Sequence, residues 1–266
     1  MFAIISTALI IKLTLLPAMI GLLSLAGRRW GPTVAGCLVG LPLTSGPVIL
    51  FLALEQGAPF AAGAAQGTIL ALISLAAFCV VYARMSRRTP WFPCLTAGSA
   101  AYLATTFILE HLTIPLPQAF LAAVLILAAA LYLLPDDLAR AVASHPPAWE
   151  IPVRMLTSAA IVIALTAAAH SLGPRLSGLL TPFPVAASIL AGFTHHFEGA
   201  AAAVRLLRGL LAGLFSFALC FLIIALTLES WGLTWSFSIA LLAAVAVQGA
   251  SLWVLASRAR NGQAIC

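Results

Sequence analysis

Charged side chains are scarce in this chain of 266 residues. Lysine and arginine together number 13 and aspartate and glutamate 7, so 8% of the residues are charged. About a quarter are charged in soluble domains. Hydrophobic residues make up 63%, and the mean hydropathy is +1.12. One water-soluble core cannot hide that much apolar surface, so the composition excludes a soluble domain. It predicts an all-α polytopic membrane protein in contact with the lipid bilayer.

Motifs for catalysis and for cofactor binding are also missing. The 5 cysteines show no CxxC spacing, and we interpret them as small buried hydrophobes. There is no Gly-rich phosphate loop, haem motif, intramembrane-protease signature or strong metal motif. The basic residues give a pI near 9.6 but lie in small groups between apolar runs, which is typical of topology signals. We therefore expect no enzyme, no cofactor, no metal and no nucleic-acid partner.

Apolar runs of spanning length follow one another along the chain. A spanning helix needs roughly 20 mostly apolar residues, which predicts about nine spans. The first lacks a signal-peptide cleavage site and is interrupted by Lys12, so we interpret it as a retained helix. The expected spans are 4–26, 33–54, 61–83, 92–109, 116–134, 152–171, 175–196, 203–228 and 235–257.

Arginines gather after alternate spans, which sets the expected orientation. By the positive-inside rule the N-terminus lies outside and the C-terminus is cytoplasmic, in a bacterial cytoplasmic (inner) membrane. A re-entrant hairpin at 33–54 would move the cluster Arg84–Arg88 outside, so we favour a full crossing there. The cytoplasmic set is Arg28, Arg29, Arg84, Arg87, Arg88, Arg140, Arg205, Arg208, Arg258 and Arg260.

Glycine and proline recur at a fixed distance, which indicates an internal duplication. Gly173 lies 142 positions after Gly31, and the same offset aligns the flanking sequences without a gap. The aligned pairs include Gly31 with Gly173, Pro32 with Pro174, Gly36 with Gly178, Pro42 with Pro184, Gly57 with Gly199, Gly67 with Gly209 and Ser74 with Ser216.

The two copies enter the membrane in opposite directions, because an odd number of crossings separates the first span from the sixth. We therefore expect a 4+1+4 inverted-topology repeat. Its parts are a first four-helix repeat (1–111), a linking helix with a cytoplasmic loop (112–149), a second repeat (150–258) and a polar tail (259–266).

Proline interrupts corresponding spans of the two copies. Proline inside a helix removes a backbone hydrogen bond and costs about 3 kcal/mol, and in lipid such a break needs cover from protein or a wet cavity. Matched breaks in inverted halves indicate a transporter binding site, and a half-helix N-terminus favours an anionic or carbonyl-bearing ligand. The alternative is that the prolines only kink packed helices. The expected substrate-binding residues are Pro42, Thr44, Ser45, Gly46, Pro47, Thr181, Pro182, Pro184 and Ser188.

Charged and titratable residues near the span ends are candidates for ion or proton coupling. Adjacent histidines on a helix point about 100° apart and make a poor chelating pair, so a proton relay competes with simple capping at the interface. Two cations at one repeat position suggest a shared role, although both side chains are long enough to snorkel. The candidates are Glu55, His195, His196, Glu198, Lys12 and Arg154.

One segment resembles a known family. Gly178, the Phe183-Pro184 break, the following helix to Gly199 and then Gly209 are similar to the small bacterial membrane proteins of the GlpM type. The first copy has Leu41-Pro42 in place of Phe-Pro. The resemblance implies a fused, inverted version of a smaller unit and carries no mechanism over to this chain.

The leading interpretation is a secondary transporter or permease that moves a small solute by alternating access, with a slight preference for an anion. We expect the two breaks to face each other near the midplane. The alternatives are a non-transporting membrane protein that assists a partner or senses the envelope, and a channel. Assembly as a homo-oligomer is left open.

Overall fold

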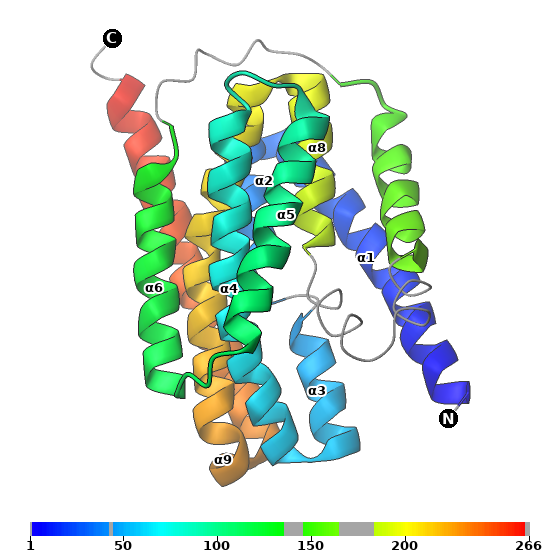
Figure 1. The fold of residues 1–266 in the computed structure, drawn as a ribbon, viewed down its shortest axis with the longest axis vertical. Helices are drawn as coiled ribbons and strands as arrows, with labels where there is room; N and C mark the ends of the chain where they lie inside the picture. The colour runs from blue at the N-terminus through cyan, green and yellow to red at the C-terminus, as the bar shows by residue number, and fades with distance from the viewer. Residues whose placement is uncertain (1, 43–44, 136–145, 165–183, 264–266) are drawn as a thin grey trace.

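The computed structural model describes residues 2–42, 45–135, 146–164 and 184–263, with side chains placed between residues 14 and 253. Every regular element in these ranges is an α-helix, as the composition predicts (Figure 1). The helices are α1 (Phe2–Trp30), α2 (Pro32–Val39), α3 (Ser45–Gln56), α4 (Ala58–Met85), α5 (Trp91–Glu110), α6 (Leu116–Leu133), α8 (Val185–Glu198) and α9 (Ala200–Gln263). A further helix covers residues 150–164.

Four of the described helices are long and apolar enough to cross a membrane, namely α4, α5, α6 and α9 up to Trp253. Their best windows have mean hydropathies between 1.4 and 2.6. They also turn large apolar side chains outward, such as Leu121 and Leu125 on α6 and Leu241 and Leu242 on α9. Large exposed apolar side chains on several helices suit contact with lipid. The count of nine spans stays a prediction.

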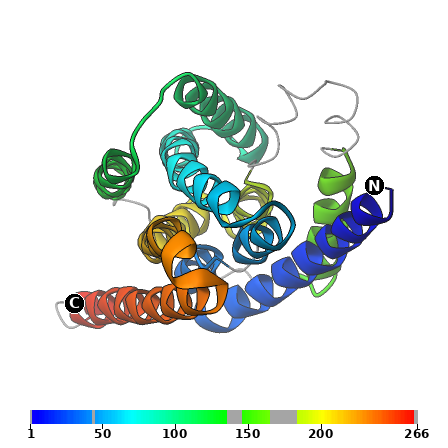
Figure 2. The same cartoon turned by 90° about the horizontal axis from the view of Figure 1, so that it is seen from below.

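The centre of the bundle is formed by α4 and the first part of α9, which pack against each other. α5 and α6 pack on α4, α8 and α2 pack on α9, and α6 also contacts α9 (Figures 1 and 2). Most of the largest fully buried side chains in the described part of the chain come from α4 and α9, including Ile69, Phe78, Tyr82, Leu207, Leu211 and Phe221.

Two glycine turns share one backbone geometry. α3 and α4 meet at Gly57 (φ 90°, ψ 167°), and α8 and α9 meet at Gly199 (φ 87°, ψ 172°). This left-handed φ is accessible to glycine at little cost and strained for other residues, which explains the residue type at both corners. α9 bends again at Gly232 (φ 73°), and the 142-residue offset pairs that position with Pro90, the residue before α5.

The helices that follow these turns run in opposite directions in the two halves of the chain. In Figure 1, α3 runs downward, α4 upward and α5 downward. By contrast, α8 runs upward, α9 descends as far as Gly232, and its remainder ascends to the C-terminus.

Two side-chain hydrogen bonds join positions that the same offset pairs. Thr106 on α5 donates to the hydroxyl of Ser74 on α4, at 2.8 Å. Ser216, in the first part of α9, donates to the side-chain oxygen of Gln248 in the second part, at 2.7 Å. Ser74 and Ser216 are both 0% exposed, so each bond satisfies a hydroxyl within the apolar interior.

The linking helix α6 is held at both ends by residues that the offset also pairs. Gln66 on α4 donates to the carbonyl of Ile114, just before α6, at 2.7 Å. Arg208 on α9 donates to the carbonyl of Leu134, just after α6, at 3.2 Å. These contacts satisfy backbone groups at the helix ends that have no partner within the helix.

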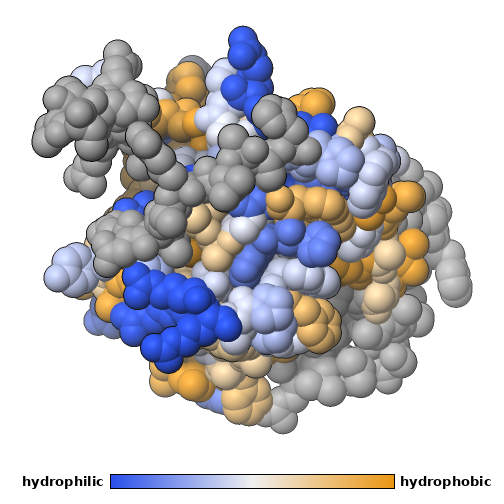
Figure 3. Space-filling view, turned by 90° about the horizontal axis from the view of Figure 1, so that it is seen from above, coloured by the Kyte–Doolittle hydropathy of each residue, from blue (hydrophilic) through white to orange (hydrophobic). Residues whose placement is uncertain are grey.

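The exposed arginines near the helix ends share one side of the molecule. Figure 1 places the end of α1, the turn between α4 and α5, and the end of α8 toward the top, and Figure 3 shows hydrophilic patches on that face. The exposed arginines of these segments are Arg28, Arg29, Arg84, Arg87 and Arg88.

Candidate functional site

The first expected break lies between two short helices. α2 ends at Val39 with Gly40 as its C-cap, and α3 begins at Ser45. Both α3 and α8 begin near mid-height of the bundle and run toward opposite faces (Figure 1). The N-terminal ends of both helices therefore lie near the middle of the bundle's height, and the free amides and helix dipole at such an end attract negative charge.

A glutamine from α9 satisfies the broken end of α2. Gln248 donates from Nε2 to the carbonyl oxygen of Cys37 at 2.6 Å and lies 2.9 Å from the Cys37 sulfur. Its own oxygen accepts from Ser216, so the amide joins α2 to both parts of α9. Gln248 is 3% exposed. The backbone amide of Gly40 also donates to the Cys37 carbonyl, at 3.1 Å, so the end of α2 has both a backbone and a side-chain partner where hydrocarbon supplies no water.

The expected substrate-binding residues divide into a described and an undescribed set. Pro42 is buried, and Ser45, Gly46 and Pro47 form the half-buried first turn of α3. Pro184 is the N-cap of α8. Thr44, Thr181 and Pro182 lie outside the described residues, so the facing arrangement of the two breaks stays a prediction.

Within the described residues, Ser188 and Ser236 have buried hydroxyls without a hydrogen-bond partner, and Ser188 is the one near an expected break. It lies in the first turn of α8, is 3% exposed, and its hydroxyl has no hydrogen-bond partner within the described part of the chain. Its backbone amide bonds to the carbonyl of Pro184. Helical side chains lean toward the N-terminus, so this hydroxyl lies on the side of the break. A buried hydroxyl without a partner costs about 1–3 kcal/mol, which a ligand or a water would recover.

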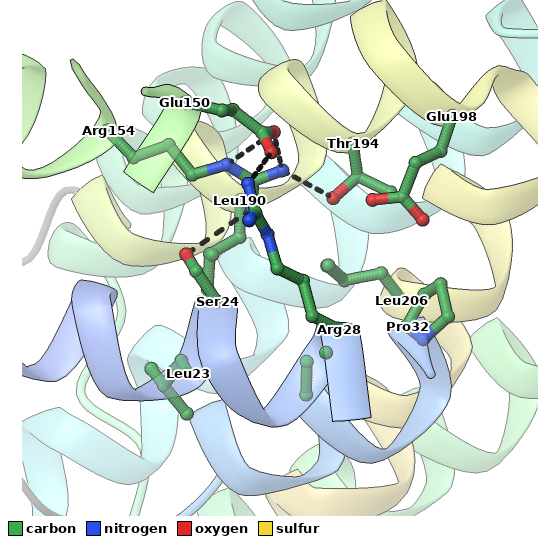
Figure 4. A pocket seen from close by; sticks show the side chains of 12 residues that line it. Leu23, Ser24, Arg28, Pro32, Glu150, Arg154, Leu190, Thr194, Glu198 and Leu206 are labelled. Carbon is green, nitrogen blue, oxygen red and sulfur yellow. Dashed lines mark hydrogen bonds and ion pairs between the residues drawn. The ribbon is translucent and has the colours of Figure 1, made fainter. Parts of the chain in front are cut away.

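A second polar site lies toward the face that carries the arginines, and we call it the Arg154 cluster. It comprises Arg28 at the end of α1, Glu150 and Arg154 at the start of the helix over 150–164, and Thr194 and Glu198 at the end of α8 (Figure 4). Glu150 is 1% exposed and Arg154 is 4% exposed. Three segments that are distant in sequence therefore bring their charges to one buried point.

Glu150 links the two arginines of this cluster. Arg154 donates from Nε to Glu150 Oε1 at 2.8 Å and also from Nη2 to the same oxygen. Arg28 donates from Nη2 to Glu150 Oε2 at 3.1 Å and to the carbonyl of Pro147 at 2.7 Å. Each carboxylate oxygen thus serves one guanidinium. The Glu150–Arg154 pair is buried, whereas the Arg28 side chain is 31% exposed and its contact is partly screened by solvent.

Hydroxyl groups and an aromatic ring complete the surroundings of Arg154. Its Nη1 lies 3.5 Å from the hydroxyl of Ser24 and its Nη2 lies 3.5 Å from that of Thr194. The guanidinium carbon lies 5.5 Å from the centre of the Phe193 ring. A planar guanidinium binds carboxylate, hydroxyl and ring face together, which an ammonium group does less well.

A small cavity adjoins the cluster. Its lining includes Ser24, Arg154, Thr194 and Glu198, and its volume is about 20 Å³. A water molecule needs roughly 10–15 Å³, so the cavity has room for one water and is too small for an organic solute. Glu198 lies just after the expected span 175–196. Burial raises the pKa of its carboxyl, and the positive charge of Arg154 opposes this rise.

The two adjacent histidines have different surroundings. His195 lies with Nδ1 3.2 Å from the hydroxyl of Tyr82, which also donates to the carbonyl of Ala191 at 3.2 Å. His196 is exposed and lies edge-on to Trp91, with ring centres 6.1 Å apart. The divergence agrees with the expected poor geometry for chelation. Within the described residues, no group of three or more potential metal ligands occurs.

The other coupling candidates are apart from this cluster or only partly described. Glu55 is exposed at the end of α3, at the opposite end of the bundle in Figure 1. Lys12 lies on α1, and its side chain is outside the described part. Of the predicted coupling residues, the structure brings Arg154 and Glu198 to one cavity.

No family model, curated protein or solved structure matches the chain. The resemblance to the GlpM type stays a prediction. The functional interpretation therefore depends on the geometry of this chain alone.

Some residues of the site were missed at the level of the sequence. Glu150 lies at the end of a polar loop and gave no sign of burial, although its spacing to Arg154 is that of a helical ion pair. Ser24 and Gln248 are isolated polar residues in apolar helices, and Thr194 directly precedes His195. A polar residue inside an apolar helix is a candidate functional residue, and this rule could have identified them from the sequence.

Proposed function

We propose that the chain is a secondary transporter of the bacterial cytoplasmic membrane, built as a 4+1+4 inverted repeat of nine spans. It moves a small solute, preferably an anion, by alternating access between the broken helices. The N-terminus is outside and the C-terminus is cytoplasmic, in keeping with the arginines gathered on one face.

Three geometric correspondences support the inverted repeat. The turns at Gly57 and Gly199 share one backbone geometry, and the helices around them run in opposite directions. The pairs Ser74–Thr106 and Ser216–Gln248 repeat one side-chain hydrogen bond. Gln66 and Arg208 bind opposite ends of α6. An axis through the middle of α6, relating the two halves, would account for all of them.

The observation that carries the transport proposal is the hydroxyl of Ser188. It is buried at a half-helix N-terminus that starts at mid-height, and it lacks a partner within the described residues. Half-helix N-termini at the midplane are the usual sites where transporters hold anionic groups of their substrates. A ligand that hydrogen-bonds to this hydroxyl would recover the cost of burying it unpaired.

The Arg154 cluster serves this function as a cytoplasmic closure with a protonatable member. Glu150 holds α1 to the helix over 150–164, and Arg154 reaches α8, so separation of these helices requires the network to break. The 142-residue offset pairs Glu150 with Ala8 and Glu198 with Gln56, so the first half has no carboxylate at either position. It pairs Arg154 with Lys12. We therefore propose that proton or ion coupling occurs on the cytoplasmic side, at Glu198.

The test is anion flux into liposomes that contain the purified protein, with chloride, phosphate, acetate and lactate as the probes. Ser188→Ala should reduce flux of the transported probe severalfold. Ser86→Ala is the matched control, because this serine is also buried but bonds to the carbonyl of Ala83. Flux of every probe equal to that of protein-free liposomes would favour the non-transporting role, and equal flux in both variants would remove Ser188 from the site.

A further inference from the structure

The two ends of the bundle expose side chains of opposite charge. The turn between α4 and α5 lies at one end and carries three arginines, all of them exposed. The other end, where α3 and α5 finish and α9 bends, exposes the glutamates Glu55, Glu110 and Glu229 (Figure 1). The arginines of the turn are Arg84, Arg87 and Arg88. The field of the molecule therefore attracts anions at the end that holds this turn.

Exposed tryptophans mark both ends of the bundle. Trp30 and Trp149 adjoin the arginine side, where Trp91 begins α5, and Trp231 and Trp235 flank the bend of α9 at the other end. Tryptophan is enriched where the lipid headgroups meet the hydrocarbon of a membrane. Because α4 and α5 are also long and apolar enough to cross a membrane, the turn that joins them lies at the level of the headgroups.

The turn is ordered by its own hydrogen bonds. The hydroxyl of Ser86 donates to the carbonyl of Ala83 at 2.9 Å, and the hydroxyl of Thr89 donates to that of Met85 at 3.0 Å. The backbone amide of Arg88 also donates to the Met85 carbonyl, at 2.9 Å. The end of α4 is thus capped without arginine side chains. A turn that is already ordered loses less conformational entropy when its side chains bind a partner.

The three guanidinium groups have no acidic partner in the part of the chain that the structure describes. Both ion pairs there use Glu150 as the acid, and the sequence has no acidic residue between Glu55 and Glu110. Guanidinium groups bind phosphate oxygens in a bidentate manner, so an exposed and unpaired set suits a phosphate group.

An apolar surface adjoins these arginines. Trp91 lies edge-on to Phe92, with ring centres 5.5 Å apart, and to His196 on α8, at 6.1 Å. These contacts fix the indole beside the turn, while the ring of Phe92 remains 58% exposed. A soluble anion would use the arginines alone, whereas a lipid has a phosphate for the arginines and a glycerol and acyl region for the two aromatic rings.

We propose that the α4–α5 turn, from Arg84 to Phe92, binds the phosphodiester headgroup of an anionic lipid such as phosphatidylglycerol. The arginines bind the phosphate, and Trp91 and Phe92 contact the lipid below it. The proposal requires that the bundle lies in a membrane but not that it transports a solute, so it goes beyond the proposed function.

The test is thermal melting of the purified full-length protein in detergent, with added phosphatidylglycerol or with phosphatidylcholine of the same acyl chains, which has no net charge. Phosphatidylglycerol should raise Tm more, because a ligand of the native state stabilises it. One arginine at an anionic lipid surface is worth about fivefold in affinity. Arg87→Gln and Arg88→Gln should therefore each need about fivefold more phosphatidylglycerol for an equal rise in Tm.

Two controls separate charge at the turn from other effects of substitution. Replacing the three arginines by lysine keeps the charge and should keep most of the response to phosphatidylglycerol. Replacing Glu55, Glu110 and Glu229 by glutamine changes three exposed charges at the opposite end and should leave the response as it is in the unmodified protein.

Three outcomes would overturn the proposal. One is an equal rise in Tm with both lipids, and another is an unchanged response to phosphatidylglycerol in Arg87→Gln and Arg88→Gln. The third is a rise of the same size with glycerol 3-phosphate, which would show a site for a soluble phosphate. None of these readouts involves transport, so the proposal stands or fails independently of the flux result.

Discussion

Replacing Glu150 by glutamine would leave the buried guanidinium of Arg154 without the carboxylate that it binds. Arg154 is 4% exposed and donates twice to Glu150, while its contacts with Ser24 and Thr194 are at 3.5 Å. Breaking a buried ion pair by removing one partner costs about 3–5 kcal/mol, because the remaining charge is uncompensated. The pair with Arg28 adds less, since that arginine can turn to solvent.

This loss should be visible as a lower melting temperature. In a chain of this size each kcal/mol corresponds to roughly 2–4 °C, so Glu150→Gln should lower Tm by about 10 °C in detergent. Glu55→Gln is the matched control, because Glu55 is exposed at the end of α3. The double variant Glu150→Leu with Arg154→Met should recover most of the loss, since it removes both charges together. A Glu150→Gln variant as stable as the Glu55→Gln control would refute the buried network.

Two further variants test other parts of the account. Gln248→Leu should lower stability by about 0.5–1.5 kcal/mol, because it removes the side-chain donor to the Cys37 carbonyl and leaves that oxygen with the Gly40 amide alone, whereas Gln56→Leu, at an exposed position, should not. Melting in detergent compares them, and equal stability would contradict the anchoring role. Burial raises the pKa of Glu198 above its ordinary 4.5, so the native state holds the proton more tightly. Stability should therefore fall as pH rises through the interval between the ordinary and the raised pKa. Glu198→Gln should remove that part of the pH dependence, and an unchanged profile would contradict it.

The break after α2 was predictable because its cause is local. Pro42 and Gly40 cannot continue a membrane helix without a cost, and the structure ends α2 at Val39. The turn at Gly57 likewise follows from a residue type that tolerates a left-handed φ. The composition was enough to predict a helical protein, because a chain that crosses lipid has to satisfy its backbone hydrogen bonds internally, as a helix does.

The Arg154 cluster was not predictable to the same degree, because burial depends on which helices meet. Arg154 was a candidate from the repeat alignment, but Glu150 sat in a polar stretch that reads as solvent-exposed. Arg28 fitted its role as a topology signal and gave no reason to expect a buried partner. Ser188 was predicted from its distance to Pro184, yet the lack of a hydroxyl partner emerges only from three-dimensional packing.

The central claim is that the two halves enter the membrane in opposite directions. Labelling of single cysteines with a membrane-impermeant maleimide in intact cells tests this claim most directly. Gln56→Cys lies beside the turn at Gly57, and His196→Cys lies near the equivalent turn at Gly199; both positions are exposed. The inverted repeat predicts that Gln56→Cys is labelled from outside and that His196→Cys is labelled only after the cells are opened. Labelling of both positions from the same side would contradict it.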